Sequence, residues 1–190
     1  MKTIHSIATW VSVLSLLLFM SCKTDTKTAT PATGESGIEA TKEQGQAFIE
    51  DDGSTPNVLN IAINSPDHTT LVAAVQAADL ENVLVNAGPL MVFAPTNAAF
   101  DALPAGTVED LLKPENKDAL ANILKFHVTP GNYDKEFLKK FKKLGQANDQ
   151  SVMVEVKGDD VYVGGAKIIA SVPAGNGIVH VVDKVMLPPQ

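Results

Sequence analysis

The sequence contains few residues that could carry out covalent or metal chemistry, namely four histidines and one cysteine. A zinc site needs three or four His, Cys or carboxylate ligands in a compatible arrangement. His68, His127 and His180 could supply three of them, but no HxxxH or HxH spacing places two on one face of a helix or strand. The single Cys22 cannot form an internal disulfide. We therefore expect no metal and no cofactor.

Paired carboxylates could act as a general acid and a general base. The adjacent pairs Asp51-Asp52 and Asp159-Asp160 lie in a linker-like segment and in a turn, where neighbouring side chains point in different directions. The sequence also lacks a GxSxG elbow, a P-loop, a GxGxxG fingerprint, an HExxH motif and an EF-hand loop. The only cysteine, Cys22, lies in an N-terminal segment that predicts its lipidation, and a lipidated cysteine cannot act as a nucleophile. The sequence therefore predicts a protein that is not an enzyme.

The N-terminus has the pattern of a secretory signal peptide. A lysine precedes an apolar run over residues 7–20, which is too short for an ordinary membrane-spanning helix. The following Ser21-Cys22 resembles a bacterial lipobox, in which the Cys is lipidated and becomes the mature N-terminus. Phe19 and Met20 depart from the usual Leu and small residue. We expect a lipoprotein signal peptide over residues 1–21 and a membrane anchor at Cys22, with plain secretion or a signal anchor as alternatives.

The segment after the cysteine has the composition of a flexible spacer. Residues 22–54 are rich in Thr, Ala, Gly and acidic residues and contain few large apolar side chains. Such a segment cannot bury enough apolar surface to offset the entropy of ordering it. We expect a tether over residues 22–54 that holds the rest of the chain away from the membrane.

From residue 55 to the end, the hydrophobic periodicity predicts one α+β domain. Apolar residues at helical spacing cover most of residues 57–126, apart from a fully apolar run over residues 90–94 that indicates a buried strand. Alternating valines over residues 152–163 and a β-branched run over residues 178–182 are separated by Gly-rich turns, which predicts a β-meander. We expect a helical layer packed on a mostly antiparallel β-sheet.

Charge is unevenly distributed along the chain. The 15 basic residues are all Lys, none is Arg, and 22 acidic residues give a formal charge of −7, so nucleic acid is not an expected partner. Five Lys nevertheless fall between positions 135 and 143. We expect Lys139, Lys140, Lys142 and Lys143 to form a basic patch that docks on an anionic partner, such as an acidic envelope polysaccharide or lipid headgroups. The alternative is a solvated face whose Lys stems cover apolar residues.

The secondary structure of this Lys-rich segment is ambiguous from its sequence. Phe137, Leu138, Phe141 and Leu144 recur at the spacing of one helix face, which predicts a helix. Residues 141–144 could equally begin a strand.

Three short motifs, in order along the chain, resemble the signature blocks of the fasciclin (FAS1) domain. VFAPTNAAF at residues 92–100 is similar to the first block, FHVTPG at residues 126–131 to the central Tyr-His block, and NGIVHVVDKVMLP at residues 176–188 to the closing block. With the expected helices and strands around these motifs, the resemblance covers residues 55–190. It implies a FAS1-like fold for that domain.

The resemblance also implies candidate binding residues. The positions that match the adhesion-linked blocks of the family are Thr96, Asn97, Phe126, His127, Asn176 and His180. Phe126 replaces the usual Tyr, so a role of the phenolic hydroxyl does not carry over, whereas an apolar packing role does. Structural roles are the alternative. Thr96 can cap a helix, and the two histidines can be buried, hydrogen-bonded core residues.

FAS1 domains are extracellular or envelope modules associated with adhesion to proteins, matrix or glycans, and the family has no general catalytic residue set. The resemblance and the signal peptide together imply a lipid-anchored, non-catalytic adhesion module that contacts proteins, matrix or polysaccharide. We expect it on the bacterial cell envelope, at the outer membrane or cell surface, with the periplasmic face as an alternative. A small-solute-binding protein is the alternative function and would need an enclosed apolar pocket. An enzyme would need a cleft with perturbed carboxyls or histidines.

Overall fold

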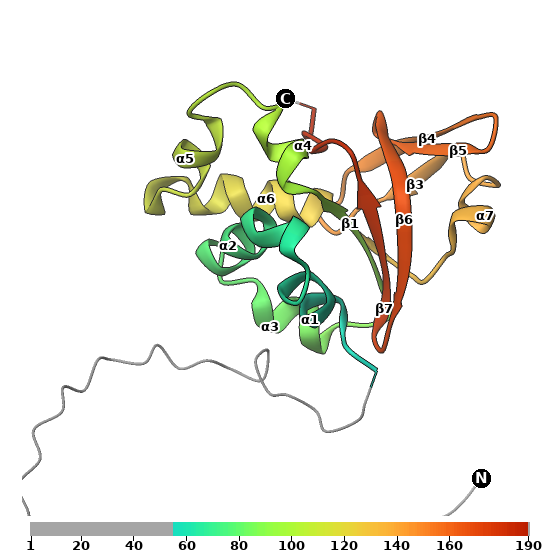
Figure 1. Ribbon diagram of the computed structural model, residues 1–190, viewed down its shortest axis with the longest axis horizontal. Coiled ribbons are helices and arrows are strands. Elements are labelled where there is room, and N and C mark those ends of the chain that lie inside the picture. Colours follow the sequence, from blue (N-terminus) through green and yellow to red (C-terminus); the bar gives the residue numbers. More distant parts are fainter. Residues whose placement is uncertain (1–54, 190) are drawn as a thin grey trace, which may run out of the picture. The chain divides into compact units, whose positions relative to one another are not determined.

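In the computed structural model, which describes residues 55–189, helices come first along the chain and most strands follow (Figure 1). The expected signal peptide, Cys22 and the expected tether lie outside the described residues. The helical elements are α1 (Val58–Ile63), η2 (Pro66–His68), α2 (Thr69–Ala77), α3 (Glu81–Asn86), α4 (Asn97–Asp101), α5 (Thr107–Leu111), η3 (Pro114–Asn116), α6 (Lys117–Phe126) and α7 (Lys135–Leu138). The strands are β1 (Leu90–Pro95), β2 (Val128–Pro130), β3 (Lys143–Gly145), β4 (Ser151–Lys157), β5 (Asp160–Val163), β6 (Ala166–Ala174) and β7 (Gly177–Val182). Within this part of the chain, no helix has both the length and the apolar composition needed to cross a membrane.

The strands form one mixed sheet in the order β2-β1-β7-β6-β5-β4-β3. The predicted meander is present, because β4, β5, β6 and β7 pair antiparallel in succession. The apolar strand β1 joins this meander in parallel to β7, with Val92 opposite Val179. The expected α+β class is therefore confirmed. The sheet is mostly antiparallel, as expected, and its one parallel pair joins the first strand of the domain to the last.

The sheet curves so that its two edge strands approach each other. The chain after β3 reaches β2, where the Ala147 amide donates a hydrogen bond of 2.7 Å to the Val128 carbonyl. This contact pairs backbone groups that would otherwise face solvent at an open edge. The curvature encloses the side chains that point to the concave face of the sheet.

Residues of β1 alternate between two hydrophobic cores, as the period of a strand requires. Leu90, Val92 and Ala94 pack against α1, α2 and α6 in the first core. Met91 and Phe93 point to the opposite face and pack inside the curved sheet in the second core. Figure 1 shows α1 to α6 gathered around the β1 end of the sheet, whereas α7 lies at the other end, with β4 and β5. The expected helical layer thus covers β1 and its neighbours and leaves the rest of the meander uncovered.

The Lys-rich segment differs from the helix that its periodicity predicted. The helix α7 ends at Leu138, and strand β3 begins at Lys143. Leu138 and Leu144 are both buried in the second core, and Leu144 reaches it from a strand that pairs with β4. The alternative of a strand in this segment is therefore confirmed. A longer helix would leave backbone groups of β4 without the hydrogen-bond partners that β3 supplies.

Candidate binding sites

Thr96 and Asn97 fasten the end of β1 to the helices around it. Thr96 Oγ1 accepts a hydrogen bond of 3.3 Å from the Ala99 amide and is the N-cap of α4. Asn97 Oδ1 accepts from the Thr70 amide at 3.0 Å, and Asn97 Nδ2 donates to the Pro66 carbonyl at 3.0 Å. The N-cap residue of α2, His68, makes no capping hydrogen bond with its side chain. Asn97 therefore caps α2 from a distant part of the chain.

His127 is a buried core residue at the end of α6, with 3% of its surface exposed. Its Nδ1 donates to the Ile123 carbonyl at 2.9 Å, and its Nε2 accepts from the Met186 amide at 2.9 Å. These partners fix the neutral tautomer, because a protonated Nε2 could not accept the amide. Burial lowers the pKa of His127 to about 4, against a smaller raising effect of the Ile123 carbonyl. The imidazole is therefore uncharged at neutral pH.

His180 lies fully buried on β7, on the side of the second core. Its ring stacks on Phe93, with centroids 5.6 Å apart. Nε2 donates to the Tyr133 carbonyl at 2.9 Å, and Nδ1 accepts from the Ser171 hydroxyl at 2.7 Å. Burial lowers the pKa of His180, against raising effects of the Tyr133 carbonyl and of Asp134. In residues 55–189, no group of three His, Cys, Asp or Glu side chains is arranged to hold a metal ion.

Asn176 lies in the turn between β6 and β7 and joins three elements. Its Oδ1 accepts from the Val58 amide at the start of α1, at 2.9 Å. Its Nδ2 donates to the Leu84 carbonyl at 2.7 Å and lies within 3.3 Å of the Val85 and Ala87 carbonyls. One side chain thus satisfies backbone groups at the end of α3, where the last turn of a helix leaves its carbonyls without partners.

Phe126 completes the set of family-matched residues. It is 3% exposed and packs in the second core. The structure therefore places all six residues in packing, capping or bridging roles that hold the fold together. Binding of a partner through these side chains stays a prediction. It is not favoured, because the same side chains already make hydrogen bonds or packing contacts within the domain.

A cluster of three aromatic rings lies at the surface around α7. Tyr133 stacks on Phe137 with centroids 5.3 Å apart, and Phe141 lies 5.1 Å from Tyr133 and 5.5 Å from Phe137. Tyr133 and Phe141 rest on the second core, whereas Phe137 is 40% exposed. The sequence prediction did not include Tyr133, although the spacing of four residues between the three aromatics was a signal for it.

The predicted basic patch lies in the same segment as these rings, and one of its lysines contacts a ring. Lys140 Nζ lies 4.7 Å from the centroid of Phe137, a cation–π contact. Lys139 pairs with Glu136 at 2.8 Å, and this hydrogen bond raises the pKa of Lys139. Lys142 and Lys143 are exposed. We call these four lysines and the three rings the α7 patch. Its positive charge is smaller than the sequence suggested, because Glu136 neutralises Lys139.

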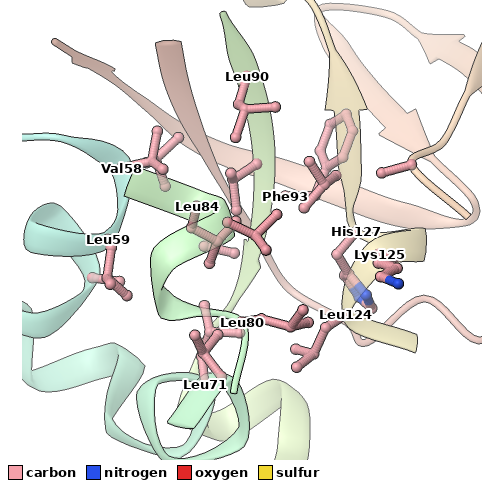
Figure 2. A pocket seen from close by; sticks show the side chains of 18 of the residues that line it. Val58, Leu59, Leu71, Leu80, Leu84, Leu90, Phe93, Leu124, Lys125 and His127 are labelled. Carbon is pink, nitrogen blue, oxygen red and sulfur yellow. The ribbon is translucent and has the colours of Figure 1, made fainter. Parts of the chain in front are cut away.

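An apolar cavity of about 170 Å³ lies between the helices and β1 (Figure 2). It is lined by side chains of α1, α2, α3, β1 and the end of α6, and nearly all of them are aliphatic or aromatic. Figure 2 shows Leu71, Leu80 and Leu124 on the helical side and Leu90 and Phe93 on β1. The two polar side chains in the lining are Lys125 and His127. The arrangement can hold an apolar molecule.

Residues 66–188 match the fasciclin domain family. Protein sll1483 of Synechocystis sp. is 42% identical over 160 residues, which cover 84% of this chain and 88% of that protein. Cell surface glycolipoprotein MPB83 of Mycobacterium bovis is 36% identical over 137 residues, which cover 70% of this chain and 60% of that protein. A FAS1 domain pair of the insect cell adhesion molecule fasciclin I has a TM-score of 0.48 at 18% identity and covers 60% of this chain and 42% of that one. The family match extends over most of the described residues, and the chain therefore belongs to the fasciclin domain family.

Proposed function

We propose that this protein is a non-catalytic adhesion module of the bacterial cell envelope, anchored through a lipid on Cys22, and that it contacts an acidic polysaccharide through the α7 patch. Membership of the fasciclin family supports a binding role. The signal-like N-terminus supports the anchor, as does the name of the mycobacterial relative, which describes that protein as a cell surface glycolipoprotein.

The observation that carries the choice of surface is the exposed ring of Phe137 with the ammonium group of Lys140 above it. Sugar rings present apolar faces that can pack on an aromatic ring, and acidic sugars carry carboxylates that a lysine can pair with. An aromatic side chain supplies this contact area at a low cost in conformational entropy. The three rings contact one another, and two of them, Tyr133 and Phe141, rest on the second core. The α7 patch is thus largely ordered before it meets a partner, which favours affinity.

The charge of the patch should set the salt dependence of binding. Each lysine near an anionic surface contributes about 1 kcal/mol at moderate salt, and the contribution falls within a Debye length of about 10 Å at 0.1 M salt. Reversing two such charges should therefore weaken binding by at least about tenfold at low salt. Raising the salt concentration should reduce that difference.

The test is retention of the full-length chain on an immobilised acidic polysaccharide such as alginate, at low and at high salt. The variant Lys140→Glu with Lys142→Glu should lose retention at low salt, and Phe137→Ala should weaken it at both salt concentrations. The matched control, Lys113→Glu with Lys117→Glu, makes the same change of net charge on the helical side of the domain. Equal losses in both charge variants would show that net charge, and not the α7 patch, governs binding. A Phe137→Ala variant that binds normally would refute the role of the ring.

The anchor is tested separately from the patch. Replacing Cys22 by Ser should release the protein from the membrane fraction of the cells that express it, because the thiol that accepts the lipid is lost. Metabolic labelling with a fatty acid should mark the wild-type chain and leave the variant unmarked. Retention of an unlabelled Cys22→Ser protein in the membrane fraction would instead favour a signal anchor.

A further inference from the structure

We propose that the cavity between the helices and β1 binds a small amphipathic carboxylate, with its apolar part inside the cavity and its carboxylate beside Lys125. This site is separate from the α7 patch and does not depend on adhesion. Solute binding in general needs only an apolar pocket, whereas the lining and the rim of this cavity specify the chemistry of both ends of the ligand.

The size and lining of the cavity determine what the apolar end of the ligand can be. Protein interiors are close-packed and contain few voids larger than a water molecule, so a volume of about 170 Å³ is unusual for a domain of this size. An engineered cavity of about 150 Å³ with a similar aliphatic and aromatic lining, in another protein, stays free of water and binds benzene. A phenyl ring or a branched group of about six carbons is therefore the natural occupant.

The exposed residues of the lining show where the cavity meets solvent. They are Val83 on α3, Lys125 on α6 and Ala147 in the chain after β3. Val83 is 53% exposed, which leaves an apolar side chain at the rim with little cover. A ligand can enter there without unfolding α1, whose lining residues Val58 and Leu59 are buried.

The charge at the rim defines the other end of the ligand. Among the described residues that line the cavity, Lys125 carries the only charge at neutral pH, because His127 is neutral and both of its ring nitrogens are hydrogen-bonded. Figure 2 shows Lys125 and His127 at the same side of the cavity. The ion pairs between described residues do not include Lys125. A lysine extends its stem along an apolar wall and keeps its ammonium in water, so it can pair with a carboxylate at the mouth.

The first experiment is a titration of the full-length chain at pH 7 with two probes that share a phenyl group. The probes are 3-phenylpropionate, which carries a carboxylate, and 3-phenylpropan-1-ol, which does not. We expect both to bind, the carboxylate about threefold more tightly, as one solvent-exposed ion pair allows. Lys125→Met should remove the preference and leave binding of the alcohol unchanged, whereas Lys125→Arg should retain it. Equal affinity of the wild type for both probes would overturn the assignment of the carboxylate end.

A second variant tests the cavity itself. Val72→Phe places a ring in the lining and should weaken both probes by at least about tenfold, since the two rings would compete for one space. Val172→Phe makes the same change on an exposed part of β6 outside the lining and should bind as the wild type does. Amide chemical shifts of the wild-type chain give a readout that does not depend on the folding of any variant, and probe-induced changes should fall on the lining residues. Absence of binding by both methods, or shifts confined to the α7 patch, would overturn the proposal.

Discussion

The buried imidazole of His180 donates a hydrogen bond of 2.9 Å to the backbone carbonyl of Tyr133, the first ring of the α7 patch. This contact joins the most buried strand pair of the domain to a surface that we propose to bind a partner. Because the imidazole also accepts from Ser171 and stacks on Phe93, its position is fixed from three sides. His180, a residue of the closing sequence motif, thus helps to position the α7 patch by holding the backbone of Tyr133.

Replacement of His180 by Phe should reduce stability and binding together. The aromatic contact with Phe93 can be retained, but the Tyr133 carbonyl and the Ser171 hydroxyl lose their partner, which should lower the free energy of unfolding by roughly 1–3 kcal/mol. Retention on alginate should also fall, because Tyr133 is no longer held. Ser171→Ala is the matched control, since it keeps the bond to Tyr133. Normal retention by a folded His180→Phe protein would show that the α7 patch does not depend on this bond.

The stability of the domain should decrease as the pH falls from about 6.5 to about 4. The pKa of His127 is about 4 in the folded protein, whereas an unperturbed imidazole titrates near 6.5. Between these values the unfolded chain binds a proton that the folded chain does not, so lower pH favours unfolding, by roughly 3 kcal/mol from this residue. The pKa values of His68 and His180 are also lowered by burial and act in the same direction.

Urea unfolding at a series of pH values measures this effect. The free energy of unfolding should be constant above the pKa of the free imidazole and should fall across the interval between the two values. His127→Gln should be less stable than the wild type at pH 7 and should show a flatter pH dependence. A wild-type profile that stays level down to pH 4 would contradict the buried, neutral state of His127.

Local features of the fold were predictable from the sequence because they depend on residues close together in the chain. The apolar run at β1 and the alternating valines of β4 and β5 indicate strands by their period alone. The N-cap role of Thr96 follows from its place before a short apolar helix. The parallel pairing of β1 with β7 joins segments 87 positions apart, as in the pair of Val92 and Val179, and no local period encodes it.

The candidate sites were less predictable, because they arise from contacts between distant segments. Asn176 accepts a hydrogen bond from the Val58 amide, 118 positions away in the sequence. The sequence predicted the turn in which Asn176 lies but not this contact. Glu136 lies in the Lys-rich segment, yet its pairing with Lys139 depends on the short helix that forms there. The cavity is a space left between helices and β1, and its volume depends on packing that a one-dimensional pattern does not contain.

Substitution of Asn176 should show a pH dependence that identifies both ends of its side chain. Asn176→Asp retains an acceptor for the Val58 amide but places a carboxylate oxygen against the Leu84 carbonyl, so it should lower stability at pH 7. A protonated carboxyl can donate to that carbonyl, and the difference from the wild type should therefore shrink as the pH falls toward 4. Asn57→Asp is the control, because Asn57 is the N-cap of α1 and a carboxylate suits that position. A pH-independent loss in Asn176→Asp would refute the donor role of its amide.

Among the glycines that the structure describes, Gly177 is the least able to accept a side chain, because β7 pairs in parallel with β1 there. A Cβ atom there would lie 1.8 Å from the Leu90 carbonyl oxygen, and this neighbour is backbone that can move only if the two strands separate. Leu90 and Gly177 are register partners at the start of the pairing, so separation would disturb the contact between the two cores. We expect Gly177→Ala to lower the free energy of unfolding by about 3 kcal/mol or more. Gly145→Ala has open space around the new methyl group and should change stability by less than about 1 kcal/mol. If both variants unfold at the same urea concentration as the wild type, the close approach of β7 to β1 is wrong.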